Sequence, residues 1–230
     1  MIVSHDYEFI FLKTNKTAGT SLEIGLSRFC GARDIITPIT PDDEALRSAL
    51  EYRGPQNFLP SAGDGLAEQV RNPERPNTHG FRFYNHMPAR EAKAELGTKV
   101  WARYYKFCFE RNPWDRVISL YYFRHPDEPR PTISEFIQSD APLVLKRRGI
   151  EVYTIDGQIA VDRICQYENL ASELEVLRQR IGIPEAIVLP KAKAGFRQDK
   201  RHYRDILGED DQAIIARFFA DEIALFGYQF

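Results

Sequence analysis

The sequence is poor in the features that mark secreted, membrane-spanning or nucleic-acid-binding proteins. Only three of its 230 residues are cysteines, and Cys30, Cys108 and Cys165 match neither a zinc-binding spacing nor a secreted disulfide framework. No window approaches eighteen consecutive apolar residues, so we expect no transmembrane segment, and a strand is predicted too near the start for a signal peptide. The net charge of −2 gives no whole-molecule attraction to nucleic acid or to a membrane. We therefore expect a cytoplasmic protein with buried thiols at Cys108 and Cys165 and no nucleic-acid partner.

Two familiar nucleotide-binding fingerprints are absent as well. A Walker A loop has a glycine, four further residues and then Gly-Lys-Ser/Thr, whereas here Lys16 precedes the single nearby glycine, Gly19. The glycines are too sparse for a G-x-G-x-x-G dinucleotide fingerprint. No compact cluster of carboxylates indicates a metal site, and we expect none.

The pattern of apolar residues predicts an α/β protein. A hydrophobic content of 43% and a charged content of 28% are typical of one globular domain over residues 1–230. Strand-like runs alternate with helical patterns, which favours a mainly parallel central sheet. The expected strands are 8–13, 81–84 and 104–110, with a hairpin at 152–161. The expected helices are 20–29, 42–52, 88–96, one that follows Asn112, 169–181 and 209–225, and residues 54–78 are expected to form a long loop.

The segment Lys-Thr-Ala-Gly-Thr-Ser at residues 16–21 follows the first predicted strand and begins the first predicted helix. Backbone N–H groups at a helix N-terminus lack partners within the helix, and the helix dipole favours an anion there. Lys16 adds a full positive charge. The arrangement predicts a phosphate-binding loop.

A second candidate anion site follows the strand predicted at 104–110. Arg111 ends that strand, Asn112 is a natural N-cap, and Ser119 lies about two turns into the following helix. An arginine fork and a short hydroxyl donor suit a phosphate. Asp115 and Arg116 are expected to cap the helix and to form surface ion pairs.

Residues 9–23 and 107–121 together resemble the two cofactor segments of sulfotransferases that use 3′-phosphoadenosine 5′-phosphosulfate (PAPS), with Asn15 where that family usually has proline. The segments 85–89, 166–170 and 221–228 are similar to the carbohydrate-type branch. The likeness runs from residue 9 to the C-terminus and is poorest over residues 30–80. It implies a P-loop-like three-layer α/β fold with a central mainly parallel sheet flanked by helices.

The resemblance also implies roles for individual residues. The 5′-phosphosulfate would be held by the loop residues Lys16, Thr17, Ala18, Gly19, Thr20 and Ser21. Arg111 and Ser119 would bind the 3′-phosphate, and a basic loop at residues 191–204 would close over the nucleotide through Arg201 and Tyr203. The reaction would move a sulfuryl group from PAPS to an acceptor hydroxyl on a glycan or a small glycoside, releasing 3′,5′-ADP without a metal.

His86 is the candidate general base, because an acceptor hydroxyl must lose its proton as it attacks sulfur. Its place after the strand predicted at 81–84 would put it at the carboxyl end of a strand, where ligands of α/β sheets gather. His79, Glu23 and Glu110 are alternatives for this role.

Two other functions stay open at the level of sequence. One is a P-loop-like nucleotide kinase or hydrolase, which predicts magnesium-dependent binding of ATP or GTP. The other is an inactive domain that binds 3′,5′-ADP. The loop at 54–78 is expected to help select the acceptor, and nothing in the sequence indicates an oligomeric state.

Overall fold

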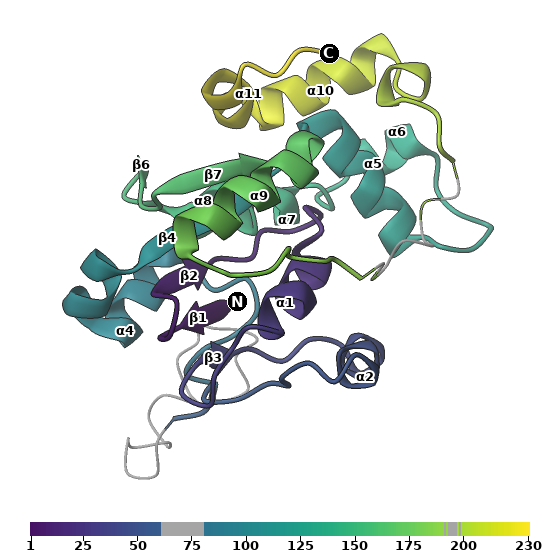
Figure 1. Cartoon of the computed structure of the whole chain (residues 1–230). Coiled ribbons are helices and arrows are strands. Elements are labelled where there is room, and N and C mark those ends of the chain that lie inside the picture. The colour runs from purple at the N-terminus through teal and green to yellow at the C-terminus, as the bar shows by residue number, and fades with distance from the viewer. Residues whose placement is uncertain (61–80, 191, 193–196, 198) are drawn as a thin grey trace.

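Within the described part of the chain, the central sheet has four strands that run in one direction and one that runs against them. The computed structural model describes residues 1–60, 81–190, 192, 197 and 199–230. In spatial order the strands are β3 (Ile35–Ile36), β1 (Ile2–Ser4), β2 (Phe9–Phe11), β4 (Tyr105–Glu110) and β7 (Arg163–Gln166) (Figure 1). The strand β1 is antiparallel to both β2 and β3, while β2–β4 and β4–β7 are parallel pairs. This arrangement confirms the prediction of a mainly parallel sheet.

The helices occupy most of the rest of the described chain. They are α1 (Gly19–Ser27), α2 (Pro41–Ala49), α4 (Ala89–Arg103), α5 (Pro113–Arg124), α6 (Ile133–Gln138), α7 (Leu143–Arg147), α8 (Ile150–Tyr153), α9 (Leu170–Ile181), α10 (Glu209–Phe218) and α11 (Ala220–Phe226), with short 3₁₀ helices η1 (Tyr167–Asn169) and η2 (Tyr203–Asp205). A two-stranded hairpin joins β5 (Thr154–Ile155) to β6 (Gln158–Ile159). Among the described residues, no helix is long and apolar enough to cross a membrane.

Helices cover both faces of the sheet, which gives the three layers that the resemblance implies. Successive strand side chains point to opposite faces. Ile10 and Cys108 face one side and pack in a cluster with residues of α4 and α8. Phe107 and Phe109 face the other side, in a cluster with residues of α1 and α9. A third apolar cluster joins α5, α6, α10 and α11, which lie together in Figure 1.

Short-range signals in the sequence predict several local features correctly. The side chain of Asn112 accepts hydrogen bonds from the backbone N–H groups of Trp114 and Asp115 at the start of α5, as an N-cap does. Asp156 and Gly157 both have positive φ in the tight turn between β5 and β6. Helix α9 ends at Gly182 in the left-handed conformation. All three cysteines are buried free thiols.

Three predicted elements differ from the structure, and one of them is the helix expected over 88–96, which is interrupted at Gly97 and continues to Arg103 as α4. Residues 81–84 form no strand, because the N–H groups of Arg82 and Phe83 both donate to the carbonyl of Phe58 while the Phe83 ring is buried in the core. The helix predicted over 209–225 is broken at Phe219 (φ −114°, ψ 30°), which separates α10 from α11. The part of the predicted 54–78 loop beyond residue 60 lies outside the described residues.

Candidate active site

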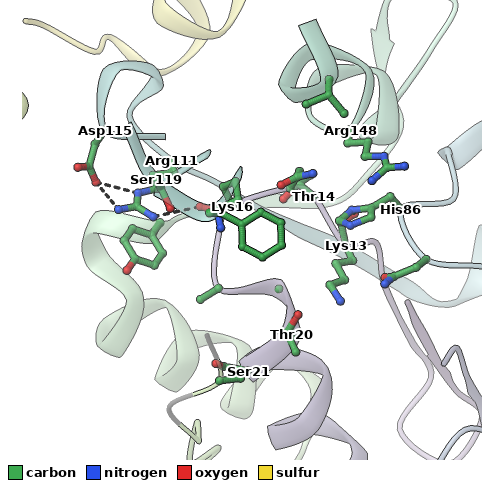
Figure 2. A pocket seen from close by; sticks show the side chains of 18 of the residues that line it. Lys13, Thr14, Lys16, Thr20, Ser21, His86, Arg111, Asp115, Ser119 and Arg148 are labelled. Carbon is green, nitrogen blue, oxygen red and sulfur yellow. Dashed lines mark hydrogen bonds and ion pairs between the residues drawn. The ribbon is translucent and has the colours of Figure 1, made fainter. Parts of the chain in front are cut away.

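A cavity of about 1450 Å³ opens where the parallel strands end. The loop after β2, Arg111 and Asn112 after β4, and Tyr167 and Glu168 after β7 all line it. Ligands of open α/β sheets bind at this edge of the sheet. Figure 2 shows Arg111 and Ser119 on one side of Lys16, and His86 and Arg148 on the other.

The loop between β2 and α1 is pinned to the sheet. The N–H group of Leu12 donates to the carbonyl of Phe107 at 2.9 Å, and the Thr14 hydroxyl donates to the carbonyl of Phe109. The N–H group of Asn15 donates to the carbonyl of Arg148 at 2.7 Å. These bonds hold the loop against β4 and against the end of α7.

The backbone of this loop has the form of an anion-binding turn. The backbones of Lys16 (φ 63°) and Ala18 (φ 59°) are both in the left-handed region, whereas Thr17 between them does not have a positive φ. Such alternation turns successive N–H groups toward one point. Ala18 is the N-cap of α1 and supplies no side-chain cap, so the N–H groups of the first turn remain available to a ligand.

Five of the six predicted loop residues line the cavity, namely Lys16, Ala18, Gly19, Thr20 and Ser21. Thr17 is buried, and its hydroxyl lies 2.8 Å from the hydroxyl of Thr14 inside the loop. The Thr17 hydroxyl is therefore engaged inside the loop, and a part for the Thr17 backbone N–H group in holding the 5′-phosphosulfate stays a prediction.

Lys13 is a residue of the site that sequence reasoning missed. It lines the cavity, and its Nζ lies 2.5 Å from Oε2 of the buried Glu23. Its side chain crosses the start of α1, so a Cβ on Gly19 would lie 2.6 Å from Lys13 Cγ. Only glycine leaves this space, which is a packing reason for Gly19 beside its place in the anion-binding turn.

Glu23 is held as a carboxylate away from the cavity. Its Oε1 accepts from the hydroxyl of Thr37 at 3.0 Å and from the amino group of Met1. Burial would raise the pKa of Glu23, but the charges of Lys13 and of the Met1 amino group lower it to about 2. Glu23 is not among the residues that line the cavity, so the alternative of Glu23 as a general base finds no support in the geometry.

The Lys16 side chain extends into the cavity. Its Nζ lies 4.0 Å from the centre of the Phe123 ring, a cation–π distance. Phe123 comes from the last turn of α5 and also lines the cavity. An aromatic face therefore holds the ammonium group beside the anion-binding turn.

Arg111 and Ser119 also line the cavity, as predicted. Arg111 Nε lies 2.8 Å from Oδ2 of Asp115, and its Nη1 donates to the carbonyl of Lys16 at 3.1 Å. Its guanidinium carbon lies 4.2 Å from the centre of the Tyr167 ring. A carboxylate, a carbonyl and an aromatic face thus fix the fork of Arg111 next to the loop.

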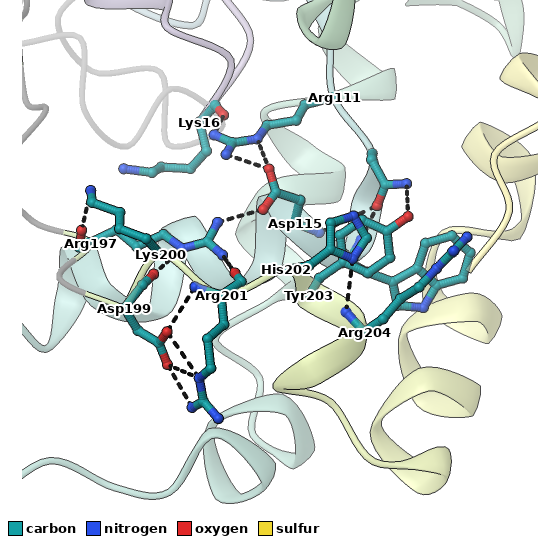
Figure 3. Close-up of polar contacts among 12 residues, drawn as sticks. Lys16, Arg111, Asp115, Arg197, Asp199, Lys200, Arg201, His202, Tyr203 and Arg204 are labelled. Carbon is teal, nitrogen blue, oxygen red and sulfur yellow. Dashed lines mark hydrogen bonds and ion pairs between the residues drawn. The ribbon is translucent and has the colours of Figure 1, made fainter.

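Asp115 joins two arginines rather than forming a surface pair. Its Oδ1 lies 2.5 Å from Nη1 of Arg197, while its Oδ2 accepts from Arg111 (Figure 3). Burial raises the pKa of Asp115, but Arg111 and Arg197 outweigh this and hold the pKa below its usual range. Arg197 is the second residue of the site that the sequence did not single out. The one sign in the sequence that it belongs to the site is its position in the basic loop at residues 191–204.

Arg201 and Tyr203, the two residues of the basic loop that are predicted to bind the nucleotide, contact neighbouring protein groups in the structure. Arg201 is largely exposed and pairs with Asp199 at 2.7 Å. The Tyr203 hydroxyl accepts from Asn112 Nδ2 at 3.3 Å, and its ring stacks on Trp114. Both line the cavity, so their predicted role in nucleotide binding stays a prediction. Lys191, Lys193 and Phe196 of the same loop lie outside the described residues.

His86 lies at the opposite side of the cavity from Arg111 (Figure 2). Its Nδ1 is 2.9 Å from the carbonyl oxygen of Lys13, an acceptor only, so Nδ1 carries the proton and Nε2 of the neutral ring does not. Burial lowers the pKa of His86 well below its usual value, and the charges of Lys13 and Arg148 lower it further. The ring is therefore neutral at pH 7, as a general base must be.

The other candidate bases fare differently. Glu110 is buried, lies 2.6 Å from Arg116 Nη1 and does not line the cavity. His79 lies outside the described residues. Arg116 itself is buried rather than exposed, so the expectation of a surface ion pair is wrong for this residue.

A comparison with protein-family models decides the family. The model described as "Sulfotransferase family" matches residues 1–142, more than half of the chain. This chain belongs to the sulfotransferase family. The matched part of the sulfotransferase contains the Lys16 loop, His86 and the segment from Arg111 to Ser119.

One relative is similar over a shorter stretch. An uncharacterized protein of Archaeoglobus fulgidus is 34% identical over 106 residues, which is 44% of this chain and 87% of that relative. No solved structure matches this sulfotransferase.

Positive charge is concentrated at the cavity of this sulfotransferase. Among the residues that the structure describes, eight lysines and arginines line it, against the three carboxylates of Glu91, Asp115 and Glu168. The chain as a whole has a net charge of −2. The charge distribution therefore favours a ligand with several negative charges at this cavity.

Proposed function

We propose that this sulfotransferase transfers a sulfuryl group from PAPS to the hydroxyl of a carbohydrate or glycoside. The observation that carries the proposal is the cationic cavity built around the uncapped start of α1. PAPS carries a phosphate at the 3′ position and a phosphosulfate at the 5′ position of its ribose. Such a polyanion suits a cavity with one group of cations at the Lys16 loop and another at Arg111. PAPS would supply an activated sulfuryl group whose leaving group is a phosphate.

We assign the 5′ end of the donor to the loop that contains Lys16 and the 3′ end to the neighbouring side of the cavity that contains Arg111. The N–H groups of residues 16–21 and the ammonium group of Lys16 would hold the 5′-phosphosulfate, because orphan N–H groups and the helix dipole favour an anion there. Arg111 and Ser119 would bind the 3′-phosphate, and Arg197 would add a second guanidinium through the shared Asp115. Arg201 and Tyr203 are proposed to contact the nucleotide at the rim of the cavity.

In the proposed reaction, His86 Nε2 accepts the proton of the acceptor hydroxyl as its oxygen bonds to sulfur. The bond between sulfur and the 5′-phosphate oxygen breaks, and 3′,5′-ADP leaves. Lys16 stabilises the negative charge that grows on this departing oxygen, an interaction that is stronger in the transition state than in the ground state.

The side of the cavity near His86 suits a sugar. Tyr84 donates to Oε2 of Glu91 at 2.7 Å, and both line the cavity with Asn85 and His86. Hydroxyl, carboxylate and amide groups bind the hydroxyls of carbohydrates. We further propose a reducing cytoplasmic location, which fits the three buried free thiols.

Calorimetric titration of 3′,5′-ADP, 5′-ADP, ATP and GTP, each with and without magnesium, tests this proposal. Magnesium-independent binding that needs the 3′-phosphate is expected, followed by transfer of labelled sulfate from PAPS to members of a glycoside panel. Binding of ATP or GTP only with magnesium would favour a kinase or hydrolase instead. Binding of 3′,5′-ADP without transfer to any acceptor would favour an inactive nucleotide-binding domain.

A further inference from the structure

Arg116 lies beneath the cavity and contacts three separate segments of the chain. Its side chain is buried on α5, with 1% of its surface exposed. Nε donates to the carbonyl of Asn15 at 2.8 Å, Nη2 donates to the carbonyl of Arg148 at 3.3 Å, and Nη1 lies 2.6 Å from Oε1 of Glu110. One guanidinium thus joins the anion-binding loop, the end of α7 and the end of β4.

The two carbonyls that Arg116 holds belong to peptides beside functional side chains. The Asn15 carbonyl is part of the peptide that precedes Lys16, a residue in the left-handed conformation (φ 63°). Non-glycine residues adopt this conformation only where their surroundings hold them in it. The N–H group of Asn15 donates to the Arg148 carbonyl at 2.7 Å, so the loop is also bonded directly to the second segment that Arg116 contacts.

The space around the guanidinium is closely fitted. A Cβ on Gly149 would lie 2.8 Å from Nη2 and 2.9 Å from Nη1 of Arg116, and it would also meet the carbonyl of Leu145. Glycine at this position allows the turn after α7 to approach Arg116. The carboxylate of Glu110 balances the buried charge, and the Tyr153 hydroxyl donates to that carboxylate at 3.2 Å.

We propose that Arg116 is a positioning residue for sulfuryl transfer. It fixes the Lys16 loop relative to the segment that carries Arg148, and therefore fixes the donor side of the cavity relative to the His86 side. Arg116 does not line the cavity and acts only through the two carbonyls. The inference rests on the proposed function, since it is the distance between donor and acceptor that Arg116 would set.

Two variants test the proposal. Arg116→Lys keeps the positive charge beside Glu110 but replaces the three-pronged fork with one ammonium group. The double variant E110Q/R116M removes both charges together, so that the Glu110 carboxylate is not left buried opposite a missing guanidinium. The matched control is Arg163→Lys on β7, which loses the fork to Glu173 in a pair of residues that do not line the cavity.

Amide hydrogen exchange and kinetics are then measured on the full chain. We expect faster exchange in residues 13–18 and 146–149 for both test variants, and a kcat about 10²-fold lower, the usual cost of misplacing reacting groups by about 1 Å. The acceptor KM should change only a few-fold, and the control should match the wild type. A kcat within about threefold of wild type, or unchanged exchange in both segments, overturns the proposal.

The same experiment separates this inference from the proposed function. Exchange is measured without donor or acceptor, so it reports the hold of Arg116 on the two segments whether or not the protein transfers sulfate. If the wild type neither binds 3′,5′-ADP nor transfers sulfate, the proposed function fails, and with it the catalytic part of this inference. In that case, amide hydrogen exchange in residues 13–18 and 146–149 still shows whether Arg116 holds the loop in place.

Discussion

His86 Nδ1 lies 2.9 Å from the carbonyl oxygen of Lys13, so the loop that is proposed to bind the donor also orients the candidate base. The contact leaves Nε2 as the basic atom. Lys13 is itself held by Glu23, which ties the orientation of the imidazole ring to a buried ion pair. The position of His86 therefore depends on the same segment that contains Lys16.

Replacement of His86 by alanine removes the proposed base. We expect kcat to fall by about 10²–10⁴-fold, the range for loss of general acid–base catalysis. The wild-type kcat/KM should stay level from pH 8 down past pH 6.5, because the pKa of His86 lies below its usual value and the ring loses its basic form only at lower pH. Activity of the variant within a few-fold of wild type would remove His86 from this role.

Replacement of Arg148 by glutamine should move the acidic limb of the pH profile. The charge of Arg148 is one of the causes that lower the pKa of His86, so its removal raises that pKa and shifts the limb to higher pH. The backbone carbonyl of Arg148, which the loop uses, is unchanged. Arg90→Gln, an exposed arginine on α4, is the control and should leave the profile in place.

Replacement of Lys16 by alanine should reduce kcat by about 10²–10³-fold, by analogy with the loss of one donor to a developing oxyanion. Stopped assays with labelled PAPS measure this value. Lys93→Ala, an exposed lysine of α4, serves as the control and should keep the wild-type rate. A Lys16 variant that loses affinity for PAPS while keeping kcat would show that this lysine binds the donor without aiding transfer.

Replacement of Arg111 by alanine should weaken 3′,5′-ADP binding by about 10- to 10²-fold, as expected for loss of charge-assisted hydrogen bonds. Binding of 5′-ADP, which lacks the 3′-phosphate, should change much less. Calorimetry with both nucleotides gives the comparison. Equal weakening of the two would contradict the assignment of Arg111 to the 3′-phosphate.

Replacement of Glu23 by glutamine removes the buried carboxylate charge that pairs with Lys13, and we expect a loss of about 3–5 kcal/mol in the free energy of unfolding at pH 7. Because the folded-state pKa of Glu23 is about 2, below its ordinary 4.5, its contribution is present above pH 4.5 and is lost as pH falls toward 2. Urea unfolding at several pH values measures both effects. The control is Glu185→Gln, which removes the carboxylate of the exposed Arg28–Glu185 pair and should cost less than about 1 kcal/mol of unfolding free energy. An equal loss of stability in the two variants would contradict the stabilising role of the buried pair.

The sequence predicts best what short-range chemistry decides. The cap at Asn112 and the turn at Asp156 and Gly157 depend on residues within a few positions of one another, and these two features follow from backbone rules that do not need the rest of the fold. The sequence also locates the loop around Lys16, but the conformation of that loop is held by the distant residues Phe109, Arg148 and Arg116.

The missed residues depend on contacts that no local pattern encodes. Arg116 reaches Asn15 across 101 positions of sequence, and Arg197 reaches Asp115 across 82. A sequence that shows Arg116 one residue after Asp115 gives no sign that one is buried and the other faces the cavity. His86 is a different case, since it lines the cavity although the strand predicted before it does not form.

The described lining of the cavity has eight cations and three carboxylates, whereas the whole chain has a net charge of −2, and this contrast has a kinetic consequence. A polyanion approaching at long range meets a slightly repulsive molecule. It is attracted only when it comes within roughly 8 Å of the cavity mouth, the Debye length at physiological ionic strength. Capture of the donor should therefore slow steeply as salt is added, whereas the charge on distant surfaces should hardly affect it. The association rate becomes a local property of the rim around Lys16, Arg147 and Lys200.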